Sequence, residues 1–79
     1  MTKDVIIEKV NHLLTEEFEI EPELLTPEAA LKQDLEIDSL DFVDIVFLID
    51  REFGFKPTAE ELKKVKTLDE FYDYIAAHV

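Results

Sequence analysis

The chain has 79 residues, 20 of them acidic and 8 basic, and a formal net charge of -12. This excess of carboxylates argues against nucleic acid as a partner, because binding to phosphate polymers relies on Lys and Arg that displace counterions. The first residues lack the apolar run of a signal peptide and no stretch is long enough to span a bilayer, so we expect a cytoplasmic protein without stable membrane insertion.

The first predicted element is a helix for which Thr2 is the N-cap. Its apolar residues recur at helical spacing and predict an end near Glu17; they are Ile6, Val10, Leu13 and Leu14. The pattern weakens over residues 18–35, where two prolines indicate a long connection. Within it, Thr-Pro-Glu at residues 26–28 is expected to open one short helical turn.

The helical pattern is strongest over residues 38–53, where Asp38 is the expected N-cap and Asp41 its capping-box partner. Gly54 is well placed to end this helix. A short helix over residues 59–65 and a last helix that begins after Thr67 follow. No segment alternates with period two, so we expect an all-α fold. The expected architecture is a four-helix bundle of three longer helices and one short helix, forming a single domain over residues 1–79.

The central helix carries two groups of apolar residues. At 100° per residue one group forms the face expected to be buried in the core, namely Phe42, Ile45, Val46, Ile49 and Phe53. The second group lies to one side, continuous with the direction of Ser39, and is bordered by charge; it comprises Leu40, Val43 and Phe47, with Asp44, Asp50 and Arg51 around them. It could line a cavity between helices, form an exposed partner-binding patch, or belong to a core that covers the helix on two sides.

Ser39 follows the expected cap of this helix. Its hydroxyl should therefore lie at the helix N-terminus, where free backbone N–H groups and the helix dipole can receive a phosphate ester. Serine near a helix start is common, so the position alone does not establish a function.

The sequence Asp-Leu-Glu-Ile-Asp-Ser-Leu-Asp at residues 34–41, with Asp-Arg-Glu-Phe-Gly-Phe at residues 50–55, resembles the acyl carrier protein family. The mark of that family is Asp-Ser-Leu at the head of its second helix. The resemblance covers nearly the whole chain, since the expected helices and the long loop occur in the same order. It implies that a phosphopantetheinyl transferase, with magnesium and coenzyme A, attaches 4'-phosphopantetheine covalently to Ser39, and that Asp38 positions the transferase and its metal. The thiol of the arm would then hold acyl groups as thioesters, so the chain itself would not be an enzyme.

The same resemblance implies a partner surface. Leu40 and Phe47 would contact partner enzymes, while Asp41, Asp44 and Asp50 would meet their Lys and Arg residues. The implied partners are synthases, reductases, dehydratases and acyltransferases with basic docking patches, in fatty-acid, lipid or polyketide-type biosynthesis. The resemblance further implies three positions that help to shelter the growing acyl chain, namely Val43, Val46 and Leu62. Of these, Val43 lies at the border between the core and the patch. We expect the carrier to be a monomer.

Some residues depart from the family pattern. Glu36 stands where the family commonly has glycine, and Arg51, which belongs to the partner surface, occupies a usually acidic position. The third helix and its exit are more basic than is typical, because of Lys63, Lys64 and Lys66. These departures leave the pathway, the partners and the cargo length open.

Other classes of site fit the residues less well. An EF-hand counted from Asp34 fails, because its sixth position is Ser39 instead of glycine and its twelfth is Ile45 instead of glutamate. His12 and His78 are far apart and accompany no nucleophile motif, so neither a metal site nor an independent active site is predicted. An aminoacyl or peptidyl carrier, and an acidic helical interaction module without an arm, stay open as alternatives.

Overall fold

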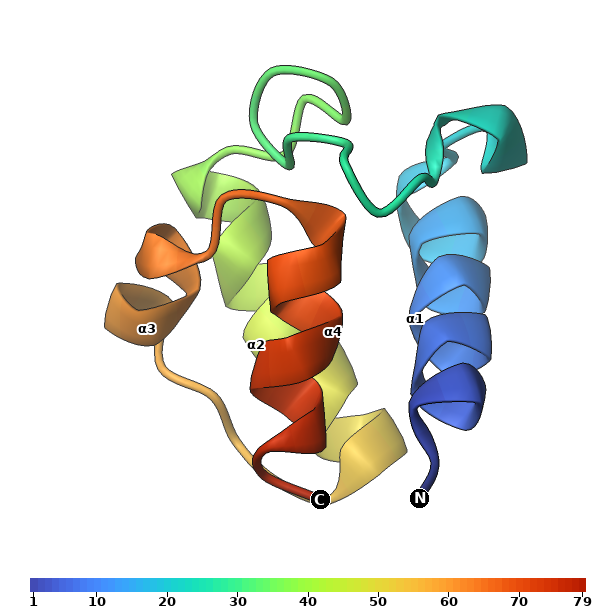
Figure 1. Ribbon diagram of the computed structural model, residues 1–79. Helices are drawn as coiled ribbons and strands as arrows, with labels where there is room; N and C mark the ends of the chain where they lie inside the picture. The colour runs from blue at the N-terminus through green and yellow to red at the C-terminus, as the bar shows by residue number, and fades with distance from the viewer.

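The computed structural model describes all 79 residues, which form four α-helices and one short 3₁₀ helix. The α-helices are α1 (Lys3–Phe18), α2 (Ser39–Phe53), α3 (Ala59–Lys64) and α4 (Leu68–Ala76), and η1 spans Pro22–Leu24. In Figure 1, α1 runs opposite to α2 and α4, and the short α3 lies beside α2. The only β-type pairing is an isolated bridge between Ala30 and Thr67. The predicted all-α fold of three longer helices and one short helix is confirmed.

The helix boundaries follow the capping residues. Thr2 and Thr67 each accept a hydrogen bond from a backbone N–H in the first turn of their helix, at 3.3 Å. Gly54 ends α2 with φ 77°, a left-handed conformation that glycine adopts without the steric cost of a side chain. The predicted ends were close, since α1 extends one residue further than expected and α3 stops at Lys64 because Val65 is already extended.

The long connection contains two short turns, of which only the second was predicted. At the predicted place, the N–H of Ala29 donates to the carbonyl of Thr26 (3.0 Å) and closes one turn that does not continue as a helix. The unpredicted 3₁₀ turn lies earlier, with Pro22 as its first residue. Proline suits the first position of such a turn because its φ is already fixed and its missing N–H is not needed there. Pro27 instead accepts a backbone hydrogen bond from Asp69 (3.0 Å) and so joins the connection to the start of α4.

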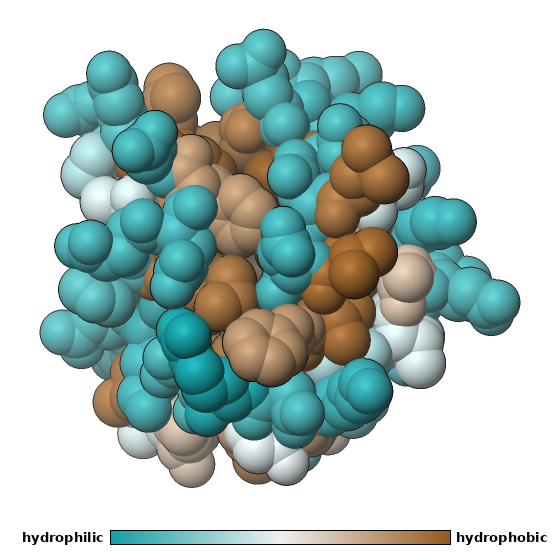
Figure 2. Space-filling model, turned by 180° about the vertical axis from the view of Figure 1, so that it is seen from behind, coloured by the Kyte–Doolittle hydropathy of each residue, from teal (hydrophilic) through white to brown (hydrophobic).

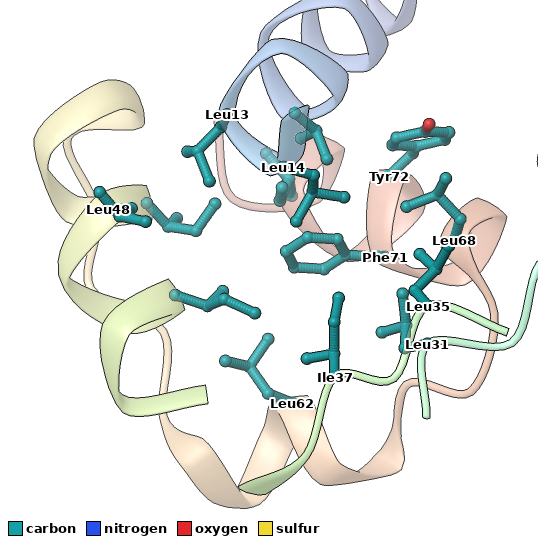
Figure 3. Packing of buried hydrophobic residues seen from close by; sticks show 14 of the residues in the cluster. Leu13, Leu14, Leu31, Leu35, Ile37, Leu48, Leu62, Leu68, Phe71 and Tyr72 are labelled. Carbon is teal, nitrogen blue, oxygen red and sulfur yellow. The ribbon is translucent and has the colours of Figure 1, made fainter. Parts of the chain in front are cut away.

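The core is one cluster of apolar side chains, with no buried polar or charged residue. Figure 3 shows Phe71 of α4 reaching into its middle, with Leu14 of α1, Leu62 of α3 and Ile37 of the long connection around it. The helix α2 contributes Phe42, Ile45, Leu48 and Ile49. The predicted core face is therefore correct at three positions, while Val46 and Phe53 lie half-buried at its edge and Leu48 was missed.

Backbone hydrogen bonds fasten the long connection to the segment between α3 and α4. The N–H of Leu31 donates to the carbonyl of Lys66 (3.0 Å), and the N–H of Leu68 donates to the carbonyl of Ala29 (2.9 Å). The N–H of Ile37 donates back to Leu31 (2.8 Å). The chain that leads into Ser39 is thereby held against the exit of α3.

Polar contacts tie the outer helices together. The Tyr72 hydroxyl of α4 donates to Oδ1 of Asn11 in α1, and burial raises the pKa of this tyrosine to about 12. At the start of α1, the Lys3 ammonium pairs with Asp73 (2.9 Å) and Asp69 (3.3 Å), and its hydrogen bond to Asp73 is the main cause of its raised pKa. None of the helices is long and apolar enough to cross a membrane.

Candidate functional site

Ser39 is the first residue of α2 and its side chain is exposed. The capping bonds at this helix start are made by its neighbours. Oδ1 of Asp38 accepts from the backbone N–H of Leu40 (2.9 Å) and of Asp41 (3.1 Å), and Oδ2 of Asp41 accepts from the backbone N–H of Asp38 (3.1 Å). The capping box predicted from the sequence is confirmed, and the Ser39 hydroxyl is left out of it.

The position of Ser39 suits a phosphate ester. It lies at the N-terminus of a 15-residue helix, where the positive end of the helix dipole stabilises negative charge. It is also the only serine in the chain. Any modification that requires a serine hydroxyl therefore has one possible acceptor, and that acceptor is exposed at a helix start.

Glu36 is a strained residue close to this serine. Its φ of 56° lies in the left-handed region, which costs a non-glycine residue roughly 1–2 kcal/mol. The observed conformation explains why glycine would be the favoured residue at this position. Glu36 is exposed, so its carboxylate adds a charge beside the start of α2.

The second apolar group of α2 forms an exposed patch. Leu40 is 78%, Val43 64% and Phe47 66% exposed. Figure 2 views the molecule from the α2 side and shows apolar groups gathered there among hydrophilic ones. Of the three interpretations offered by the sequence, the exposed patch is the correct one. Val43, expected at the border between core and patch, belongs to the patch, because it lies one turn from both Ser39 and Phe47 and away from the buried Ile45 and Ile49.

The charged residues expected around this patch differ in their surroundings. Asp44 and Asp50 are exposed on α2, while Asp41 is half-buried and engaged in the capping box. Arg51 pairs with Glu17 of α1 (3.4 Å) and with Glu52 (3.3 Å). Its guanidinium is thus turned toward α1, at a distance along the helix from Leu40.

Two of the positions implied to shelter cargo lie at the core. Leu62 is fully buried in the central cluster, and Val46 packs half-buried against it. Val43 does not join them. Their role toward an acyl chain stays a prediction.

A pocket of about 440 Å³ opens beside Ser39. It lies between the start of α2, the long connection and the exit of α3, and sequence reasoning missed it. Its apolar base includes Leu31, Ile37 and Phe42, and three lysines line its exposed rim, namely Lys32, Lys63 and Lys66. The basic character around α3 was noted from the sequence, but only the fold brings the loop residue Lys32 to the same place.

Comparisons with known proteins agree with this site. A family model described as "Phosphopantetheine attachment site" matches residues 8–75, which include the whole of α2. The acyl carrier protein of Thermosynechococcus vestitus is 36% identical over 95% of this chain and 93% of its own length. The acyl carrier proteins of Rubrobacter xylanophilus and Coprothermobacter proteolyticus are each 32% identical, over 99% and 100% of this chain and 96% of their own lengths. The fold, the exposed serine and the matching family model define a phosphopantetheine-bearing carrier domain. The chain belongs to the acyl carrier protein family.

The prosthetic group of this family is 4'-phosphopantetheine, and the residues around Ser39 fit it. An exposed hydroxyl at a helix N-terminus can form and stabilise the phosphodiester link. The neighbouring pocket has an apolar base that suits the apolar part of the arm, and cationic side chains line its rim. The bound group supplies a thiol on which acyl intermediates are held as thioesters. No cluster of three or more His, Cys, Asp or Glu side chains is arranged to hold a metal ion.

Proposed function

We propose that Ser39 is the residue to which the phosphopantetheine arm is attached. The observation that carries the proposal is that the only serine of a chain in this family stands exposed at the head of α2. In the transfer, Ser39 Oγ forms a bond to the phosphorus of coenzyme A that bears the pantetheine, while the bond from that phosphorus to the nucleotide breaks. The hydroxyl proton passes to a base of the transferase, and the helix N-terminus stabilises the negative charge on the phosphate oxygens.

Asp38 is proposed to help position the transferase and its magnesium. Its capping bonds go to Oδ1. The other carboxylate oxygen is therefore available to an approaching partner without loss of the cap. Any substitution at this residue will affect both roles, because an N-cap contributes about 1 kcal/mol to its helix.

Partner enzymes are proposed to dock on the exposed face of α2. Leu40 and Phe47 supply apolar contact area beside Ser39, and Asp44 and Asp50 supply negative charge around it. A net charge of -12 favours fast association with basic docking patches, since long-range attraction raises the rate of encounter. Asp41 and Arg51 are proposed to act at the margins of this surface, because both already have partners within the chain.

Further proposals complete the function. Residues 1–79 are proposed to form one carrier domain, which works as a monomer and is not itself catalytic. Its proposed partners are a phosphopantetheinyl transferase and the synthases, reductases, dehydratases and acyltransferases of acyl biosynthesis. Val46 and Leu62 are proposed to border the space that shelters an acyl chain. A cytoplasmic location stays a prediction, which fractionation of cells that produce the protein would test.

The test is the intact mass of the protein after incubation with a broad-specificity transferase, coenzyme A and magnesium. Wild type should gain the mass of one phosphopantetheine, and Ser39→Ala should gain none. Thr58→Ala is the matched control, because it removes another hydroxyl at a helix start, the N-cap of α3, and should leave the gain unchanged. A wild-type mass that never changes with an active transferase present contradicts the proposal.

The two alternatives from the sequence differ in standing. An acidic module without an arm conflicts with the family match over residues 8–75. An aminoacyl or peptidyl carrier is favoured by no observation on this chain. Loading by an amino-acid-adenylating enzyme, and not by an acyl ligase, would be the result that supports it.

A further inference from the structure

The pocket beside Ser39 combines an apolar base with a basic rim. One side is formed by the start of α2, with Ser39 and Phe42, and the opposite side by α3 and its exit, with Lys63 and Lys66. The third lysine, Lys32, comes from the connection that backbone hydrogen bonds hold against that exit. The volume of the pocket, about 440 Å³, lies in the range of about 300–1,000 Å³ found for small-molecule sites.

The three lysines of this rim are free of ion pairs within the chain. All salt bridges of the molecule involve Lys3 or Arg51, and no carboxylate lies within 4.0 Å of a rim lysine. Six of the eight basic residues have no ion pair, and three of these six gather at this one pocket. Asp38 is the only acidic residue that lines the pocket. The pocket is therefore a locally cationic site in an anionic protein, and its charge is available to an external anion.

We propose that this pocket binds the far end of the acyl cargo when that end carries a carboxylate. The carrier would then prefer half-thioesters of dicarboxylic acids over methyl-ended acyl groups of equal length. The proposal rests on attachment of the arm at Ser39. It names a class of cargo that attachment alone does not require.

The positions of the lysines favour the cargo over the phosphate of the arm as their ligand. The phosphate is fixed to Ser39 on the α2 side of the pocket, whereas Lys63 and Lys66 come from the opposite side. An arm that folds back over the apolar base would bring the end of its cargo toward these lysines. Because the cargo is tethered, its effective concentration at the pocket is high, so contacts between exposed charges that are weak individually can still decide its position.

The experiment loads the protein through the transferase with the coenzyme A esters of hexanoate and of adipate, which have equal chain length and differ in the terminal carboxylate. Backbone amide shifts are recorded for the apo, holo, hexanoyl and adipoyl forms, together with their melting temperatures. The adipoyl form should show additional shifts at Lys32, Lys63 and Lys66 and a higher melting temperature than the hexanoyl form. Salt at about 1 M, where the Debye length falls to about 3 Å, should remove most of this difference.

Substitutions then assign the effect to the rim. A triple variant should abolish the differences in amide shifts and melting temperature between the adipoyl and hexanoyl forms; it combines Lys32→Gln, Lys63→Gln and Lys66→Gln. Lys64→Gln is the matched control, since it removes the neighbouring charge of α3 that does not line the pocket, and should leave the difference intact. Arginine at the three positions should preserve it. All these side chains are exposed, and circular dichroism of the apo variants verifies that they fold.

Several results would overturn the proposal. Equal shifts in holo and adipoyl forms would make the arm phosphate the ligand, and equal responses to hexanoyl and adipoyl cargo would assign binding to the apolar base alone. Unchanged rim lysines in every loaded form would leave them facing a partner protein instead. Failure of the attachment proposal is distinct, because the protein would then gain no mass at Ser39 and no loaded form would exist to compare.

Discussion

The two faces of α2 carry apolar residues of similar size but use them differently. Ile45 and Ile49 are buried against the other helices, whereas Leu40 and Phe47 are left largely in water on the side of Ser39. Burial of a large apolar side chain contributes about 1.5–3 kcal/mol to folding, and the exposed face forgoes that contribution. The difference indicates that the buried face specifies the fold, while the exposed face is free for the contacts with partner enzymes that we propose.

The largest expected effect tests the buried face. Ile49→Ala should lower the free energy of unfolding by about 2–5 kcal/mol, because it leaves a cavity in the core. This is a large part of the roughly 4–12 kcal/mol expected at about 0.05–0.15 kcal/mol per residue. Phe47→Ala on the exposed face should change it by no more than about 0.5 kcal/mol. Urea denaturation measures both, and equal losses would break the comparison.

The next effect tests the exposed face through binding. Phe47→Ala should lower kcat/KM of a partner enzyme for the carrier about tenfold, equivalent to ~1.4 kcal/mol, if this exposed aromatic side chain makes the partner contact that we propose. Leu24→Ala is the control, since Leu24 is an exposed apolar residue of η1 outside the α2 patch. Steady-state kinetics should find Leu24→Ala unchanged. A similar loss in both variants would remove the special role of the patch.

A third effect concerns the contact between α1 and α4, which we expect to stabilise the fold without taking part in docking. Tyr72→Phe removes the hydrogen bond to Asn11 and should cost about 1 kcal/mol at neutral pH. Burial raises the pKa of Tyr72 to about 12 in the folded protein. Below about pH 10 the hydroxyl of Tyr72 is protonated in both the folded and the unfolded protein, whereas above that pH the unfolded protein loses this proton first. Wild type should therefore lose stability between about pH 10 and pH 12.

The Tyr72→Phe variant should show a shallower alkaline decline in denaturation experiments at several pH values. Tyr74→Phe is the comparison, because burial also raises the pKa of Tyr74 but its hydroxyl bonds the exposed Glu61. An alkaline decline that is identical in wild type and Tyr72→Phe would contradict the assignment. Partner kinetics of Tyr72→Phe should equal those of wild type.

The smallest effect concerns strain beside the attachment site. Glu36→Gly relieves a left-handed conformation that costs about 1–2 kcal/mol, and glycine gives back about 0.4–1 kcal/mol through the entropy of the unfolded chain. The free energy of unfolding of Glu36→Gly should therefore exceed that of wild type by ~0.5 kcal/mol, which urea denaturation measures. Glu19→Gly, at φ 55° beyond the end of α1, should give a similar gain at the other left-handed residue that is not glycine. A loss of stability in Glu36→Gly would show that the Glu36 side chain makes contacts that offset its strain.

Much of the fold could be predicted because the signals are local. Thr2, Asp38, Thr67 and Gly54 mark helix ends through their own side chains or backbone preferences, and the spacing of apolar residues defines the buried face of α2. The head of α2 with Ser39 was predicted for the same reason. Periodicity could not decide whether the group around Val43 is covered, since that depends on where the other helices lie.

Features that depend on contacts between distant segments were missed. The pocket beside Ser39 requires Lys32 to meet the exit of α3. The pairing of Arg51 with Glu17 likewise joins residues far apart in the sequence. Neither has a local sequence signal. The 3₁₀ turn is a different case, because proline at its first position is a local signal that was not used.

Attachment of the arm at Ser39 is tested most directly by tandem mass spectrometry on peptides of the transferase-treated protein. The peptide containing Ser39 should carry one phosphopantetheine, with the fragment ions placing it on that serine. Attachment at Ser39 is excluded if the protein gains the mass while its Ser39 peptide remains unmodified, or if the group is found on a threonine.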